Sequence, residues 1–193
     1  MNDTTTLIVF GVAVAVLLIG GLALNQPSPA PEPEPAPQVT VPQKTLEMLG
    51  PVYSEKGVFQ DDALYISFKA AIDGDNKVES RIPVWIHNVS SDAIVILWDR
   101  CSITMQDGNT VPLVPESHLT ATEALPDVIT IAPGGDLFEA LIPVTEITRT
   151  DGGYTLSTAA IDQGPFLLTL AVEATGDGCA RTIRYYPFRL IIR

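Results

Sequence analysis

Prolines occupy every second position of residues 27–37, PSPAPEPEPAP, and this run limits the fold of the chain more than any other. Each proline fixes φ and lacks a backbone N–H, so neither a helix nor a sheet can continue through it. Residues 25–43 are therefore expected to form an extended linker. At about 3.1 Å per residue in polyproline II form, its sixteen residues 27–42 reach roughly 50 Å. A ligand for a proline-recognising domain is the alternative reading of the same run.

The part before the linker contains an apolar run, residues 7–24, without a charged, amide or hydroxyl side chain. Its eighteen residues would form a helix of about 27 Å, close to the hydrocarbon thickness of a bilayer. The run predicts one transmembrane helix at 7–24, after a short tail at 1–6. A cleaved secretory signal is the alternative, but the tail MNDTTT lacks the basic residues that begin such a signal.

Lysine and arginine do not orient the expected span, because all eleven of them follow residue 43. An apolar segment, a proline-rich spacer and a β-rich domain form a common layout of exported proteins. This layout favours anchoring in the bacterial inner membrane, with the globular domain extracytoplasmic. Within the span, small residues on a four-residue spacing would let another membrane helix pack closely, and they are the candidate helix-docking residues: Gly11, Ala15 and Ala23.

After the linker, residues 44–193 alternate or run apolar over strand lengths, with Gly, Asn and Asp in the turns. The expected strands are 63–71, 81–89, 93–98, 102–106, 110–114, 127–131, 136–144, 164–174 and 180–193. A short helical turn is expected at 45–49. Strands 81–89 and 180–193 contain proline, which predicts edge positions or bulges. The fold class is all-β, an Ig-like antiparallel β-sandwich.

Three stretches carry a resemblance to a known group: IPVWIHNVSSDAIVILWDRCSI, DGNTVPLV and PDVITIAPGGDLFEALIPV. They resemble uncharacterised bacterial membrane-anchored or lipoprotein Ig-like β-sandwich domains in an Asn-containing strand end, a Trp-Asp pair and a Pro-Gly turn before an apolar strand. The resemblance covers residues 80–193 and implies the fold but no activity. The chain departs from the lipoprotein forms because it lacks a cysteine for lipidation directly after the apolar run, so the span itself is expected to hold the protein.

The charge of the globular part argues against nucleic acid as a partner. Residues 44–193 contain eleven basic and twenty acidic residues, a formal charge of −9, and no cluster of Lys or Arg. The two cysteines, Cys101 and Cys179, are either a disulfide pair or two free thiols, and the spacing does not decide between them. The two histidines and two cysteines lack the spacing of a zinc site, and neither histidine lies near a nucleophile motif. We therefore expect no metal, no cofactor and no enzyme activity.

Candidate partner-contact residues come from one strand and one loop. Trp85 shares a strand face with Pro83 and His87, and His118 lies in the polar stretch 115–127, the longest irregular segment of the domain. Asn88-Val89-Ser90 also matches a glycosylation acceptor.

These features predict a non-catalytic, single-pass accessory or structural subunit. It would dock on a larger membrane protein complex, such as a photosynthetic or respiratory assembly, through other transmembrane subunits and its extramembrane domain. The alternative is a membrane-anchored extracytoplasmic binding module for a protein or a small ligand.

Overall fold

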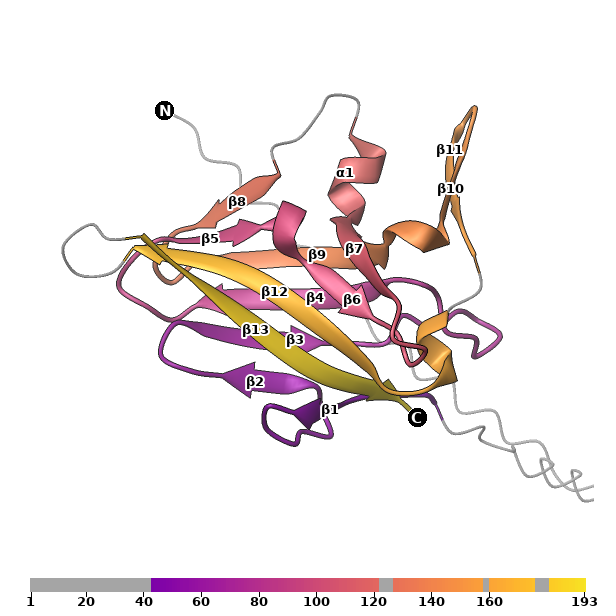
Figure 1. Ribbon diagram of the computed structural model, residues 1–193, viewed down its shortest axis with the longest axis horizontal. Coiled ribbons are helices and arrows are strands. Elements are labelled where there is room, and N and C mark those ends of the chain that lie inside the picture. The colour runs from indigo at the N-terminus through magenta and orange to yellow at the C-terminus, as the bar shows by residue number, and fades with distance from the viewer. Residues whose placement is uncertain (1–42, 122–126, 158–159, 176–180) are drawn as a thin grey trace, which may run out of the picture. The chain divides into compact units, whose positions relative to one another are not determined.

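The computed structural model describes residues 43–121, 127–157, 160–175 and 181–193 (Figure 1). The expected tail, the span with Gly11, Ala15 and Ala23, and the linker up to residue 42 lie outside the described residues. Within the described part of the chain, no helix is long and apolar enough to cross a membrane.

The first of two antiparallel sheets, here called sheet A, is built around the long C-terminal strand. That strand pairs on one side with β1 and on the other with β12, and the far edge of β12 pairs with β5 and β6. A 3-10 turn, η1 (Trp98–Arg100), separates β5 from β6, and β8 extends the sheet beyond β5. Sheet A contains β1 (Leu46–Gly50), β5 (Ile94–Leu97), β6 (Ser102–Thr104), β8 (Val128–Ile131), β12 (Phe166–Thr175) and β13 (Arg181–Ile192).

Sheet B lies against sheet A and has the strand order β2-β3-β4-β9. One strand, β7 (Thr110–Pro115), joins the sheets, because residues 110–112 pair with β6 and residues 113–115 pair with β9. The expected all-β antiparallel sandwich is therefore confirmed. Sheet B contains β2 (Val58–Gln60), β3 (Leu64–Phe68), β4 (Ile82–Asn88) and β9 (Asp136–Pro143).

The open edges of the two sheets approach each other at β1 and β2, which makes the sandwich nearly closed. Met48 and Ser54 exchange two backbone hydrogen bonds, and Phe68 N donates to Gly57 O. Gly57 has φ +62°, and a Cβ there would lie 2.8 Å from the Phe68 carbonyl oxygen. Only glycine fits this close approach without strain.

The core lies between the sheets and follows from the alternation in the sequence. In β4, residues Ile82, Val84 and Ile86 are at most 3% exposed, whereas the residues between them point outward. Phe68 of sheet B meets Phe188 of sheet A edge to face at 5.0 Å between ring centroids. Burying an apolar side chain of this size contributes about 1.5–3 kcal/mol, so the facing rows hold the sheets together.

Four more short elements lie outside the two sheets. They are α1 (Glu116–Thr120), η2 (Val144–Glu146), the hairpin β10–β11 (Ile147–Thr150 and Gly153–Leu156) and η3 (Ala160–Gln163). The hairpin forms a separate two-stranded sheet that projects from the body (Figure 1).

Two local predictions are wrong. Residues 45–49 form no helical turn, because Leu46 and Met48 alternate toward the core in β1, which pairs with β13. Strand 81–89 is also not an edge strand, because β4 lies between β3 and β9. In β13, by contrast, the pairing with β1 covers residues 189–192, beyond Pro187, and contains a register shift, as the proline predicts. Pro83 is tolerated because β3 ends at Phe68; the next residue, Lys69, donates its N–H to the Pro83 carbonyl, and proline cannot return a bond.

Candidate functional site: an aromatic face on sheet B

The outward side of sheet B carries two cross-strand rows of side chains. The strand register aligns Tyr65, His87 and Asp136 in one row. The neighbouring row contains Ser67, Trp85 and Phe138 in the same order of strands. We call the five larger side chains the aromatic face: Tyr65, Trp85, His87, Asp136 and Phe138.

The rings of this face contact one another around Trp85. Phe138 stacks parallel to Trp85, with 5.9 Å between centroids and 5° between planes. Tyr65 lies 5.1 Å from Trp85 on its other side, tilted by 57°. Phe138 is 74% exposed, the largest value among the exposed large hydrophobic residues of the described chain. An aromatic cluster left open in this way is typical of a binding surface, because single exposed apolar residues are ordinary and contiguous ones are not.

A carboxylate fixes the polar edge of the aromatic face. The Trp85 Nε1–H donates to Asp136 Oδ1 at 2.8 Å, and His87 Nδ1 lies 3.0 Å from the same oxygen. These hydrogen bonds, first from Trp85 and then from His87, lower the pKa of Asp136 below its ordinary value. The Asp136 carboxylate is therefore ionised at neutral pH.

A mostly apolar groove of about 240 Å³ lies beside Trp85 and Phe138. Its other lining residues come from β3, β4, β9 and the position directly after β3: Ser67, Lys69, Pro83, Val84 and Glu139. Aromatic walls with a few polar groups at the rim are the usual composition of a recognition groove.

The structure brings together two of the three predicted contact residues. Trp85 and His87 share the outer face of β4, as the alternation of the strand predicts, with 6.4 Å between ring centroids. His118 does not join them. It lies on α1 and lines a separate hollow with Trp98, Pro112 and Asp127.

Three members of the aromatic face were missed by the sequence reading. Tyr65, Asp136 and Phe138 come from β3 and β9, the neighbours of β4 in the sheet. The alternation of 136–144 signals that Phe138 and Asp136 share a side. Only the order of the strands places that side next to Trp85.

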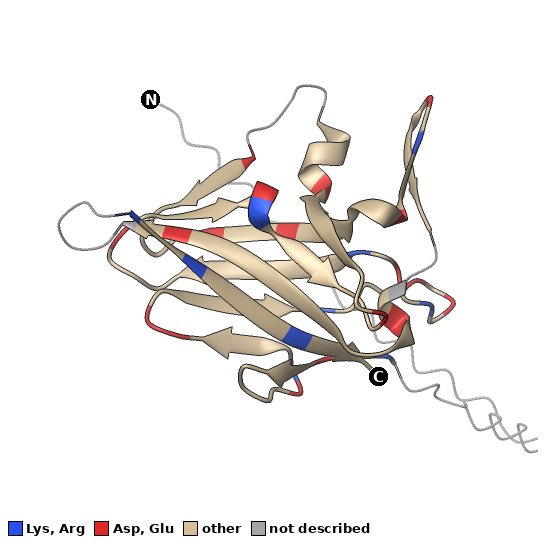
Figure 2. Cartoon of the chain, viewed as in Figure 1, with Lys and Arg blue, Asp and Glu red and all other residues tan. Residues whose placement is uncertain are grey.

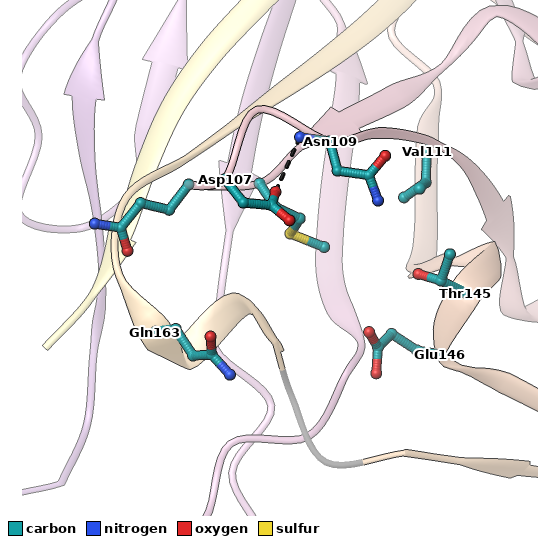
Figure 3. Close-up of a pocket in the computed structure, with 8 residues that line it drawn as sticks. Asp107, Asn109, Val111, Thr145, Glu146 and Gln163 are labelled. Carbon is teal, nitrogen blue, oxygen red and sulfur yellow. Dashed lines mark hydrogen bonds between the residues drawn. The ribbon is translucent and has the colours of Figure 1, made fainter.

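A second candidate site is a polar hollow of about 520 Å³ near the end of the sandwich (Figure 3). Asp107 and Asn109 line it from the turn between β6 and β7, Thr145 and Glu146 from η2, and Gln163 from η3. Figure 3 shows Thr145 and Glu146 on one side of the hollow and Asp107 and Gln163 on the other.

Glu146 is the most unusual group of this hollow, because it is an acidic residue that is only 8% exposed. The Ser157 hydroxyl donates to its Oε2, and the Ser80 hydroxyl lies 3.3 Å from the same oxygen while donating to the Ser157 carbonyl at 2.8 Å. No Lys or Arg of the described residues forms an ion pair with Glu146. Burying a carboxylate without a counter-charge is costly. The Glu146 carboxylate can therefore accept a further hydrogen bond from a polar ligand in the hollow.

Cys101 lies in the core beneath β12 and is 1% exposed. Its thiol donates to the Leu97 carbonyl at 3.2 Å and lies 3.5 Å from the Ala171 nitrogen. Burial raises the pKa of Cys101 to about 11. Cys179 lies outside the described residues, so the disulfide stays a prediction.

Asn88 is a structural residue and not an exposed glycosylation acceptor. Its side chain is fully buried, and its Nδ2 donates to Asp92 O at 2.8 Å and Ile131 O at 3.0 Å. Its Oδ1 accepts from the backbone N and the hydroxyl of Ser90. The Asn and Ser of the glycosylation motif therefore serve to hold the end of β4 through these hydrogen bonds.

No group of three or more metal-ligating side chains occurs among the residues that the structure describes. The chain matches no family model, no curated protein and no solved structure. The aromatic face and the polar hollow are the two candidate sites of the described chain.

Proposed function

We propose that the chain is a non-catalytic, membrane-tethered accessory protein. Its β-sandwich, of the Ig-like class, docks through the aromatic face on the extramembrane part of a larger membrane protein complex. Residues 7–24 anchor it in the bacterial inner membrane, and the linker 25–43 holds the sandwich outside the cytoplasm.

The observation that carries the proposal is the exposed stack of Trp85 and Phe138. Tryptophan, tyrosine and phenylalanine are enriched at the cores of protein interfaces, where a few aromatic residues supply most of the binding energy. The strand pairing and the bond from Trp85 to Asp136 hold the rings in place before a partner arrives. Such preorganisation lowers the entropy cost of binding.

Site-specific photocrosslinking tests the docking surface. The full-length protein is expressed in its native membrane with p-benzoylphenylalanine at position 138, on sheet B, or at position 185, on sheet A. Tyr185 is a matched control, because it is also an exposed aromatic residue, at 56% against 74% for Phe138. We expect a defined product with a membrane protein from position 138 and none from position 185. Equal products from both positions, or none from 138, contradict the docking role.

Membrane fractionation tests the tether separately. We expect the full chain to stay in the membrane after alkaline carbonate washing and to migrate in mild detergent as part of a complex larger than itself. A mature chain that begins near Leu24 and appears in the aqueous fraction would contradict the anchor.

A second candidate function, an anchored binding module for a small polar ligand, is favoured by the hollow around Glu146. Its volume of about 520 Å³ falls in the range of ligand sites, and its lining supplies carboxylate, amide and hydroxyl groups. The test is a thermal-shift screen of the full-length protein with monosaccharides, polyamines and divalent cations. A ligand of the hollow should raise the melting temperature of the wild type but not of Asp107→Asn, whereas Asp75→Asn, on a turn that does not line the hollow, should respond as wild type. No shift with any compound contradicts the binding module.

A further inference from the structure

We propose that the aromatic face binds an arginine side chain of the docking partner, with the guanidinium stacked on the ring of Phe138 and donating to the carboxylate of Asp136. This inference rests on the proposed function, because it names the chemistry that the partner presents to the same surface.

The carboxylate of Asp136 has an open acceptor. Both of its hydrogen bonds, from Trp85 and with His87, use Oδ1, and Oδ2 has no hydrogen bond with the described residues. The side chain is 44% exposed, and its ion pairing within the described chain is limited to His87. A donor from outside the chain can therefore reach Oδ2 without displacing the Trp85 bond.

No lysine or arginine of the described residues neutralises this carboxylate. Lys69 is the cation that lines the groove, but it follows the end of β3 and lies against Pro83, whereas Asp136 lies opposite His87. Four residues of strand separate these positions, about 13 Å at the usual rise. Among the described residues, Lys69 accordingly forms no ion pair with Asp136, whose ion-pair partner is His87.

The rings supply the second half of a cation site. The faces of Trp, Tyr and Phe attract cations within about 6 Å of the ring centroid. Phe138 is widely exposed and parallel to Trp85, and the strand that carries it begins at Asp136. Arginine suits this pairing better than lysine, because its planar guanidinium stacks on a ring while its N–H groups bond a carboxylate.

The charge of the whole domain favours the same partner chemistry. Residues 44–193 carry a formal charge of −9, so a partner with a basic surface is attracted over a longer range than one contact. Charge complementarity thus supports a protein partner with an exposed arginine.

The experiment uses full-length ¹⁵N-labelled protein in uncharged maltoside micelles. The probes are N-acetyl-arginine methylamide and the citrulline compound of the same shape, which carries no charge. The readout is the indole N–H resonance of Trp85, and the indole of Trp98, only 4% exposed, serves as the internal reference. We expect a saturable shift of the Trp85 resonance with the arginine probe and about fivefold weaker binding of citrulline.

Two variants locate the effect. Asp136→Asn keeps an oxygen acceptor for Trp85 but removes the charge, and it should weaken arginine binding about tenfold. Phe138→Ala should weaken it about threefold by removing the stacked ring. Asp75→Asn, which removes the same charge from a 77% exposed side chain on another turn, should bind as wild type.

Equal shifts with both probes, no shift with either, or unchanged binding by Asp136→Asn overturns the arginine inference. If position 138 still crosslinks to a membrane protein in that case, the docking role stands and only the arginine is wrong. If arginine binds as expected but position 138 gives no crosslink, the proposed function fails while the cation site stands.

Discussion

The outer sides of the two sheets use charge in different ways. On sheet A, arginines of β13 and the C-terminus pair with carboxylates of the same chain: Arg181 with Glu173, Arg184 with Asp62, and Arg193 with Glu47. On sheet B, strands β3 and β4 contain no Lys, Arg, Asp or Glu, and the colouring of Figure 2 shows this contrast with β13. The carboxylate of the aromatic face is held by Trp85 and His87 and has no Lys or Arg partner among the described residues. The arginines of sheet A are already paired within the chain. The Asp136 carboxylate has no such cation and lies beside exposed rings, so it is available to a partner.

The exposed aromatic residues of the two sheets differ in the same way. Tyr185 of sheet A lies opposite Ala171 and makes no ring contact with the aromatic side chains of the described chain. Phe138 of sheet B is part of a connected cluster of rings. An isolated exposed ring is ordinary on protein surfaces, so exposure alone does not identify a site.

The largest effect is expected where the two sheets are joined. Asn88 ends β4 of sheet B, and its Nδ2 donates to Ile131 O in β8 of sheet A. Asn88→Ala removes this donor from the buried Ile131 carbonyl and should lower the free energy of unfolding by about 3 kcal/mol, measured by urea denaturation. Asn109→Ala, at an exposed turn, is the control and should cost under about 1 kcal/mol. Equal losses would show that the two faces do not depend on this joint.

The next effect concerns the thiol of Cys101, which is buried in the core. Burial raises the pKa of the Cys101 thiol from 9.0 to about 11, so the reactive thiolate is scarcer in the folded protein. In the reduced protein at pH 8, the native thiol should react with iodoacetamide at least roughly a hundredfold more slowly than in urea. Native labelling at the unfolded rate would contradict the buried position. Labelling in urea without reductant also decides the pairing with Cys179, because a disulfide leaves neither thiol to react.

The same shift gives a pH dependence with a definite sign. Because the pKa is raised in the folded state, the unfolded chain loses the proton first, and the contribution to stability is complete below about pH 9. It is lost as the pH rises toward 11. The urea midpoint should therefore fall less between pH 8 and pH 10.5 for Cys101→Ala than for the reduced wild type. Identical falls would mean that other groups control alkaline unfolding.

Substituting one exposed ring on each sheet should change the free energy of partner binding by less than the losses expected above. Trp85→Ala removes the central ring of the cluster and should weaken binding of the crosslinked partner by about 2 kcal/mol, roughly thirtyfold. Tyr185→Ala should change the affinity less than about threefold. Both variants are compared by titration with the purified partner after their urea midpoints are measured. A loss for Tyr185→Ala as large as for Trp85→Ala would remove the distinction between the faces.

The strands of both sheets could be predicted because their alternation is local. The rows of Ile82, Val84 and Ile86 against Trp85 and His87 are read directly from β4. The strand β1 could not be predicted in this way, because LEML fits a helical turn as well. Its state is decided by pairing with β13, whose partner residues lie more than a hundred positions away.

The candidate site could be predicted only in part for a related reason. Trp85 and His87 were found because they share one strand. Tyr65, Asp136 and Phe138 join them through the strand order β3-β4-β9, and no local pattern encodes that order. The hollow around Glu146 depends on η2, η3 and a turn, which carry no periodic signal.

The smallest effect is expected from the paired charges of sheet A. Arg184 Nη1 lies 3.1 Å from Asp62 Oδ1, and both side chains are well exposed, at 46% and 79%. Exposed ion pairs of this kind contribute about 0–1 kcal/mol, because solvent screens them and the side chains lose rotamer freedom. Arg184→Ala should therefore lower the unfolding free energy by under about 1 kcal/mol in urea denaturation and leave partner affinity unchanged. If it weakened the partner as much as Trp85→Ala, sheet A would also dock, and the self-neutralised face would have to be read as a second interface.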